Sequence, residues 1–295
     1  MGDDSTWSTP RPLWLRRFID FAPSMWSYSV LLHYGVGTYA VLLGSYLAAC
    51  LPFAVLDRSG FATRWRIQPS PPRQDVAAAK RMVVLNFAWL LPAVLAASPL
   101  LRLLFPSDAQ PPPLASAPFT ALAWFVLHDL SFYCYHRTLH EVPWLYASVH
   151  KPHHKFTAPF AWTSHAVHPA EMALQAAGAM AGPLLWARLY GLPVRTWWCW
   201  LALVQAQGVM DHSGYDLPAP LDCFGMLPGF GGTRFHDDHH RYFTGNYAAA
   251  LSLIDDLMGT RLRVEPRGGA GAGRGASAVV RAVEPARWDW KRDGF

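Results

Sequence analysis

The chain has 295 residues, of which 52% are hydrophobic and 15% charged, a charged share below the roughly 25% of typical soluble domains. The net charge of +5 comes from 25 Lys and Arg against 20 Asp and Glu, and the basic residues are scattered around apolar segments. This scatter excludes a basic stripe that binds nucleic acid and is typical of side chains that meet lipid headgroups. The four cysteines form no CxxC pair, and we interpret those in apolar runs as reduced packing residues.

Five apolar stretches predict helices, in the order 28–56, 82–105, 114–140, 171–190 and 194–210. A spanning helix needs about 20 mostly apolar residues, and each of these stretches is about that long or longer. A proline-rich connector separates the second stretch from the third, and a Gly-Leu-Pro break separates the last two. The pattern predicts an all-α fold, a polytopic membrane helical bundle with about four to five spans.

Basic residues between the first two stretches indicate the topology. They are Arg58, Arg64, Arg66, Arg73, Lys80 and Arg81. The positive-inside rule places this loop on the cytoplasmic face, so the second and third stretches bring the chain back to that face at His140. The hairpin 171–210 returns the chain to the same face again. Arg11, Arg16 and Arg17 then lie on the opposite face, against the rule, unless the first stretch is re-entrant.

The two ends of the chain differ in composition from the apolar middle. Residues 1–27 are polar and proline-bearing and lack the pattern of a cleavable signal peptide. The C-terminal RGGAGAGRGAS run is low in complexity, so we expect a disordered tail over 263–295. Between them, 28–262 is expected to form a single integral-membrane domain.

Three histidine boxes carry the chemistry of the sequence. Of 13 histidines, all but His33 lie between His128 and His240. Histidine is the commonest metal ligand near neutral pH, because its imidazole is often neutral and free to coordinate. The boxes are HxxxH at 136–140, HxxHH at 150–154 and HxxHH at 236–240.

The spacing within the boxes favours two metal ions. Histidines four apart share one helix face, and the extra histidine of HxxHH lets one box reach both ions. The boxes supply eight imidazoles, whereas one tetrahedral zinc takes four ligands. Asp129, seven residues before His136, is expected to accept the free N–H of a ligand imidazole. The bundle is therefore expected to be capped by a cytosolic, histidine-rich di-metal domain.

Several longer motifs resemble the fatty acid hydroxylase/sterol desaturase superfamily of membrane di-iron enzymes, over roughly 125–262. They are HRTLH at 136–140, HKPHHKFTAPF at 150–160, HPAE at 168–171, DHSGYD at 211–216, FHDDHHRYFTGNYA at 235–248 and DDLMGT at 255–260. The second box region resembles that of C-4 methylsterol monooxygenases. The HSGY element is shared by those enzymes and cholesterol 25-hydroxylases.

The resemblance implies a set of metal ligands that includes one histidine outside the boxes. Spacing alone leaves His212 open between a ligand and a packed histidine, and its HSGY context favours the ligand. The implied ligands are His136, His140, His150, His153, His154, His212, His236, His239 and His240.

Other polar residues are expected to support the ligands or to remain structural. His128 is expected to line a cavity or to contact a ligand, and His168 to act structurally or behind a ligand. The alternative for each is to be a metal ligand itself. Asp237 and Asp238 are expected either to accept hydrogen bonds from ligands or to form a solvated acidic turn. Asn246 is expected to orient a ligand or bound water.

Two more histidines have no clear ligand role. His165 stands where related methylsterol oxidases tend to have an acidic residue, and its role stays open. His33 is expected to pack at a helix interface.

The resemblance implies an O2-dependent oxygenase with two Fe ions that hydroxylates an unactivated C–H bond of a sterol, at a C-4 methyl group or in the side chain. The first alternative is a fatty-acid or sphingolipid hydroxylase or a C-5 sterol desaturase. The second, from another class, is a non-catalytic membrane protein that binds zinc structurally or transports metal. Metal ligands placed after the spans argue against a transporter.

The expected partners follow from this chemistry. The sequence has no HPGG haem motif and no GxGxxG motif after a strand. Electrons from NAD(P)H are therefore expected to come from a separate donor, cytochrome b5 or its reductase. The enzyme is expected in the endoplasmic reticulum of a eukaryote or the inner membrane of a bacterium, with its metal site on the cytoplasmic face.

Overall fold

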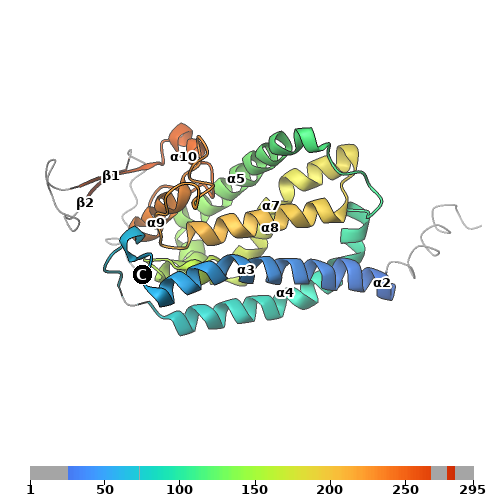
Figure 1. The fold of residues 1–295 in the computed structure, drawn as a ribbon, viewed down its shortest axis with the longest axis horizontal. Helices are drawn as coiled ribbons and strands as arrows, with labels where there is room; N and C mark the ends of the chain where they lie inside the picture. Colours follow the sequence, from blue (N-terminus) through green and yellow to red (C-terminus); the bar gives the residue numbers. More distant parts are fainter. Residues whose placement is uncertain (1–25, 73, 267–277, 283–295) are drawn as a thin grey trace, which may run out of the picture.

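The computed structural model describes residues 26–72, 74–266 and 278–282. In these ranges the chain is mostly helical, and its long helices lie side by side with two short helices at one end (Figure 1). The long elements are α2 (Tyr28–Val30), which continues through a π-helix (Leu31–Val36) into α3 (Gly37–Ser59), then α4 (Val76–Leu104), α5 (Ala117–Glu141), α7 (Pro169–Tyr190) and α8 (Val194–Asp211).

Shorter elements follow α5 and α8. They are α6 (Pro143–Leu145), a π-helix (Tyr146–His150), 3-10 helices at His153–Lys155 and Ala161–His165, α9 (Gly232–Tyr242) and α10 (Ser252–Met258). These segments collect at the end of the bundle where α3 and α5 finish and α4 begins (Figure 1). The histidine boxes lie in this part of the fold.

Local sequence signals set the ends of the long helices. Asp75 caps α4 by accepting the Ala78 N–H at 2.9 Å, and Gly60 ends α3 in the left-handed conformation with φ 67°. Gly191 and Pro193 form the predicted break between α7 and α8, because Gly191 adopts φ 75° and Pro193 cannot continue a helix. All five predicted apolar stretches are helices.

Close backbone contact between α5 and α7 positions the first histidine box. A Cβ atom at Gly182 would lie 2.8 Å from the Trp124 Cα atom, so only glycine allows this approach. Trp200 of α8 packs edge-on against Trp124 and donates to the Ala179 carbonyl at 2.7 Å. The three helices therefore form one packed unit around which α3 and α4 lie.

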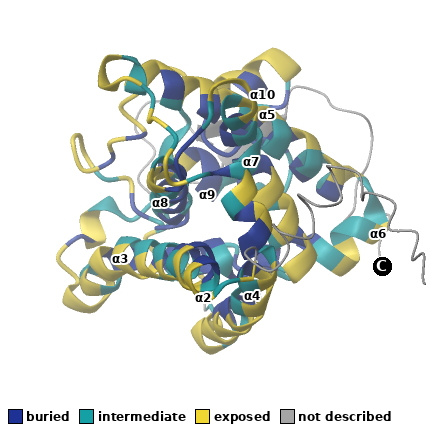
Figure 2. Ribbon diagram, turned by 90° about the vertical axis from the view of Figure 1, so that its right-hand side faces the viewer, coloured by how far each residue is buried: buried dark blue, intermediate teal, exposed yellow. Residues whose placement is uncertain are grey.

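Among the residues that the structure describes, two helices are long and apolar enough to cross a membrane, Tyr28–Ser59 and Val76–Leu104. Their outward faces carry large exposed apolar side chains, including Leu51, Val84 and Trp89. Figure 2 shows exposed residues along the outside of α3 and α4 and buried residues around α8 and α9. These features indicate a membrane protein, and the count of four to five spans stays a prediction.

The basic loop between α3 and α4 lies against the HSGY segment. The Ile67 N–H donates to the Gly214 carbonyl at 3.0 Å, and the Asp216 N–H donates to the Trp65 carbonyl at 2.8 Å. The Tyr215 hydroxyl donates to the Asp57 carboxylate at 2.7 Å. The loop therefore lies at the same end of the bundle as His212.

Part of the expected disordered tail is ordered. Strand β1 (Leu262–Pro266) pairs antiparallel with β2 (Ala278–Ala282), with Val264 opposite Val280. The low-complexity composition of the intervening run concealed two short segments with β-branched residues, which favour strands. The rest of the predicted tail, 267–277 and 283–295, lies outside the described residues, as does the predicted N-terminal segment up to residue 25.

Candidate metal centre

Four parts of the fold supply the nine histidines that the sequence singles out. They are α5 with His136 and His140, the segment after it with His150, His153 and His154, the end of α8 with His212, and α9 with His236, His239 and His240. The fold brings all nine together although they span more than a hundred positions in the chain. Eight of them are buried, and His140 is partly exposed.

The nine side chains divide into two groups, in each of which the candidate ligand atoms all lie within 4.8 Å of one another. The five-histidine group consists of His136, His140, His150, His154 and His239. The four-histidine group consists of His153, His212, His236 and His240. The two groups match the predicted pair of metal sites in number.

The Nε2 atoms converge at the centre of the five-histidine group. The Nε2 atom of His150 lies 2.9 Å from that of His140, 3.1 Å from that of His136 and 2.9 Å from that of His154. Nitrogen atoms that bind one ion at about 2.1 Å and at right angles lie about 3 Å apart. The spacing therefore fits imidazoles around a single ion.

The four-histidine group has the same geometry. The Nε2 atom of His212 lies 3.3 Å from that of His153 and 3.0 Å from that of His236. The Nε2 atom of His240 lies 3.1 Å from that of His236. Both groups therefore present imidazole nitrogens at the separation that metal ligands have.

Backbone carbonyls fix the tautomer of three of these rings. The Nδ1 atoms lie 2.7 Å from the Tyr247 carbonyl in His136, 2.7 Å from the Gly208 carbonyl in His212 and 2.8 Å from the Gly245 carbonyl in His239. A carbonyl only accepts, so each Nδ1 must carry the proton and each Nε2 must present a lone pair. Lone pairs that converge without a proton repel one another, and a bound cation removes that repulsion.

Burial keeps these imidazoles neutral. Burial lowers the pKa of His239 to about 4. Burial and then the neighbouring imidazoles lower the pKa of His154 well below its usual range. Neutral imidazole is the form that binds metal, so the site can bind cations at neutral pH without first losing protons.

Adjacent histidines belong to different groups. His153 and His154 are neighbours in the chain, but the first lies in the four-histidine group and the second in the five-histidine group. His239 and His240 divide in the same manner. The expectation that an HxxHH box reaches two sites at once agrees with this arrangement.

Asp129 contacts the backbone instead of a ligand ring, which corrects the expectation from its spacing to His136. Its carboxylate accepts the N–H groups of Ala249 at 3.1 Å and Ala250 at 2.9 Å, and also that of Leu251. The loop after α9 folds back onto α5, and the spacing within α5 could not show that. Asp129 fixes the loop whose Tyr247 carbonyl holds His136.

The acidic and amide residues near the third box also anchor backbone or side chains outside the groups. Asp237 is buried in α9, not in a solvated turn, and accepts from Gln68 at 2.9 Å. Asp238 is partly exposed. Asn246 donates to the Phe235 carbonyl at 2.8 Å, and its side-chain oxygen accepts the Leu262 N–H at 2.8 Å. Asn246 thus positions α9 itself.

The remaining histidines lie outside both groups. His128 and His165 line the cavity described below. His168 caps α7, because its Nδ1 atom accepts the Ala170 N–H at 3.2 Å. His33 packs against Trp198 of α8 with ring centroids 5.1 Å apart, as expected for a residue at a helix interface.

Glu171 is a functional candidate that the sequence reasoning missed. Its carboxylate oxygen lies 2.9 Å from the Nδ1 atom of His150, and both side chains are at most 2% exposed. A carboxylate behind a ligand imidazole holds the ring in place and raises its basicity. The signal was present, because an acidic residue that opens an apolar helix is costly without a role.

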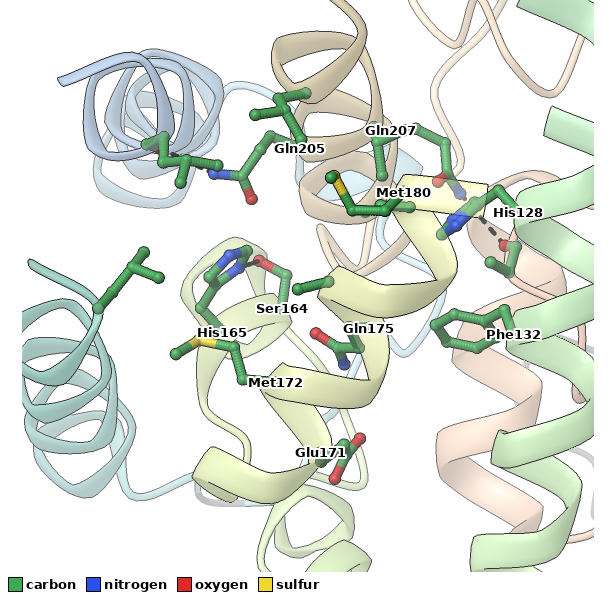
Figure 3. Close-up of a pocket in the computed structure, with 18 of the residues that line it drawn as sticks. His128, Phe132, Ser164, His165, Glu171, Met172, Gln175, Met180, Gln205 and Gln207 are labelled. Carbon is green, nitrogen blue, oxygen red and sulfur yellow. Dashed lines mark hydrogen bonds between the residues drawn. The ribbon is translucent and has the colours of Figure 1, made fainter. Parts of the chain in front are cut away.

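A largely apolar cavity of about 410 Å³ ends at the histidines. This volume lies within the roughly 300–1,000 Å³ of small-molecule sites. His153, His212 and His236 of the four-histidine group and His136 of the five-histidine group line it. Figure 3 shows polar side chains of α7 and α8 around the part of the cavity that His128 and Glu171 border.

Comparisons with known proteins agree on one family. The family model for fatty acid hydroxylase matches residues 121–260. Methylsterol monooxygenase 2-2 of Arabidopsis thaliana is 32% identical over 81% of this chain and 92% of its own length. A methylsterol monooxygenase of Aspergillus fumigatus is 34% identical over 75% of each chain. A very-long-chain aldehyde decarbonylase of Oryza sativa subsp. indica is 31% identical over 80% of this chain and 90% of its own length.

No solved structure matches the chain significantly. The fold and the site define a helical membrane protein whose buried histidines can hold two metal ions at the end of an apolar cavity. The chain belongs to the fatty acid hydroxylase family, and it is an oxygenase enzyme that acts on lipids. Family membership sets aside the alternative of a non-catalytic zinc-binding or metal-transporting protein.

Proposed function

We propose that the two histidine groups each hold one iron ion and that the enzyme uses O2 to hydroxylate an unactivated C–H bond of a sterol. The main evidence for this proposal is that nine imidazoles converge into two groups, and that both groups border one apolar cavity. All nine histidines are proposed as ligands. Histidine is a ligand that iron accepts well, and a group of five exceeds what tetrahedral zinc takes.

The chain's own residues have three tasks in this reaction. Backbone carbonyls and Glu171 hold the imidazole rings in the orientation that aims Nε2 inward. The apolar walls of α4 and α8 exclude water and position the lipid so that one C–H bond lies beside the centre. Bound iron would supply the activation of O2, with two electrons and two protons taken up in each turnover.

Two features favour a sterol among the possible lipids. The relatives named above include methylsterol monooxygenases, which match most of this chain. The second feature is the HSGY element at 212–215, which resembles that of C-4 methylsterol monooxygenases and cholesterol 25-hydroxylases. It packs against the basic loop and supplies His212 to the four-histidine group. Oxidation of a C-4 methyl group and hydroxylation of the side chain both stay open at this level. A fatty-acid or sphingolipid hydroxylase and a C-5 sterol desaturase are the alternatives.

A second candidate reaction comes from the relatives named very-long-chain aldehyde decarbonylase, which match the chain at 31% identity. That reaction would shorten a fatty aldehyde and not add oxygen to a sterol. The two candidates differ in their products, so one lipid profile can separate them.

The proposal places the site on the cytoplasmic face of the endoplasmic reticulum, or of the inner membrane in a bacterium. The basic loop 60–75 lies at the histidine end of the bundle, which supports the placement. Electrons from NAD(P)H would arrive through a separate protein, cytochrome b5 or its reductase. Exposed cations at this end, such as Arg64, Arg81 and Arg241, favour an acidic donor.

The test compares lipids of cells that express the chain with lipids of cells that express His153→Ala. We expect an oxidised sterol, and loss of its precursor, only with the unchanged chain. Purified protein loaded with iron should be active, and protein loaded with zinc should not. No change in any sterol would refute the sterol assignment, and a new hydrocarbon in its place would favour aldehyde decarbonylation.

A further inference from the structure

The cavity is polar at its histidine end and apolar at the other end. On α7, Glu171 and Gln175 line the cavity first, and Ala179 and Met180 line it further along. On α8 the order reverses, so that Asp211 and Gln207 lie near His212, and Leu201 and Trp197 lie furthest from it. Because the two helices run in opposite directions, the lining residues of both change from polar to apolar with distance from the histidines.

Most polar groups at the histidine end already have partners. Gln207 donates to Asp211 and, at 3.2 Å, to the Ala249 carbonyl. The Ser164 hydroxyl donates to the Ala161 carbonyl at 3.1 Å. Glu171 lies against His150. These groups are therefore not free to bind a substrate without losing an existing contact.

Gln175 differs from these three groups. In the part of the chain that the structure describes, its amide makes no hydrogen bond, although the residue is only partly exposed. Figure 3 shows the amide extending from α7 into the cavity, among Ser164, Met172 and Phe132. An amide in an apolar cavity gains free energy when a ligand supplies its missing partner.

Gln175 also lies close to the metal centre. It is one helical turn from Glu171, about 6 Å along the axis of α7. Glu171 in turn contacts His150 of the five-histidine group. An oxygen atom bound by Gln175 would therefore lie near the histidines, with the rest of the ligand directed toward Leu201 and Trp197.

We infer that Gln175 binds the oxygen function of the lipid substrate and presents the carbon atoms beside that oxygen to the histidine groups. The inference rests on the proposed function and sharpens it. In a sterol the ring hydroxyl lies on the carbon next to C-4, so this orientation selects C-4 methyl oxidation. A substrate oxidised in its hydrocarbon tail would need the opposite orientation, with its oxygen at the apolar end.

The test is a binding measurement without turnover, made on the full chain in detergent micelles. The probes are a C-4 dimethyl sterol with a free ring hydroxyl and its analogue with hydrogen in place of the hydroxyl. Each competes with a radiolabelled sterol. We expect the unchanged chain to bind the hydroxyl sterol about three- to tenfold more tightly, the effect of one neutral hydrogen bond.

Gln175→Met keeps the length of the side chain and removes the amide. We expect it to lose the preference by weakening only the hydroxyl sterol, whereas Gln74→Met, outside the cavity, keeps it. Equal affinity of the unchanged chain for both probes would overturn the inference and leave sterol binding intact. Equal weakening of both probes by Gln175→Met would also overturn it, because a structural role predicts that result.

Two further outcomes separate this inference from the proposed function. If neither sterol binds, the sterol assignment fails and the inference fails with it. If the enzyme oxidises the sterol side chain, the lipid oxygenase function stands and the orientation is wrong. An oxidised C-4 methyl group together with the loss of preference in Gln175→Met would support both.

Discussion

The two histidine groups differ in how they meet the cavity. Three of the four members of the four-histidine group line it, whereas His136 alone does so among the five members of the other group. The five-histidine group has more ligands and the buried carboxylate of Glu171 behind one of them. The comparison suggests a division of labour in which the four-histidine group meets the substrate and the five-histidine group is the more firmly held site.

The largest expected effect comes from a pair of neighbouring substitutions, His153→Ala and His154→Ala. His153→Ala leaves three imidazoles in its group, so we expect about one metal ion per purified chain in place of two. His154→Ala leaves four imidazoles, enough for a tetrahedral site, so we expect close to two ions. Elemental analysis of purified protein measures both, and equal losses would contradict the proposed difference.

A second test removes the carboxylate that fixes the loop beside the five-histidine group. Asp129→Ala leaves the buried N–H groups of Ala249, Ala250 and Leu251 without their acceptor. Each buried N–H group without an acceptor costs about 1–3 kcal/mol, so we expect the free energy of unfolding to fall by more than about 3 kcal/mol. The thermal midpoint in detergent measures the change. Asp256→Ala, at an exposed carboxylate of α10, serves as a control and should shift the midpoint little.

Glu171→Gln tests the support of the five-histidine group alone. It keeps the size of the side chain and replaces the carboxyl group beside His150 with an amide. Removing a residue that hydrogen-bonds to a metal ligand typically lowers metal affinity about 10–100-fold. We expect a loss of this size at the five-histidine group and none at the four-histidine group. Competition with a chelator measures it. Glu141→Gln, at a largely exposed carboxylate of α5, is the matched control, and an equal loss there would remove the special role of Glu171.

The smallest effect is expected from Gln68→Met, which should affect the two histidine groups equally. Gln68 joins the basic loop to α9 by donating to the Thr157 carbonyl and to Asp237. Gln68→Met should destabilise the fold by about 1–2 kcal/mol, because the buried Asp237 carboxylate loses a donor. Since α9 serves both groups, metal release should quicken at both. A change at one group only would show that α9 does not move as one body.

Local spacing explains why the ligands were predictable. Histidines three and four apart fall on one side of a helical segment whatever the rest of the fold does, and HxxHH repeats that pattern twice. The division into two groups was not predictable, because it depends on how α5, α9 and the end of α8 meet. No residue near His140 in the chain indicates that it joins His239 and not His240.

Contacts across the fold explain the remaining differences. Asp129 has the helical spacing of a ligand partner, but the loop that returns to it comes from residues 249–251. Hydropathy predicts a start of this helix at residue 82, whereas α4 begins at Val76. Asp75 caps a run of alanines, lysine and arginine that favours helix without being apolar. Propensity and capping, and not hydrophobicity, set that boundary.

Two pairs of adjacent histidines, His153–His154 and His239–His240, link the two histidine groups through the backbone. The ring centroids lie 5.6 Å apart in His153 and His154 and 5.8 Å apart in His239 and His240. One peptide unit in each doublet therefore joins the two groups directly, in addition to the packing of the helices. One residue inserted into either doublet would shift one group of ligands relative to the other.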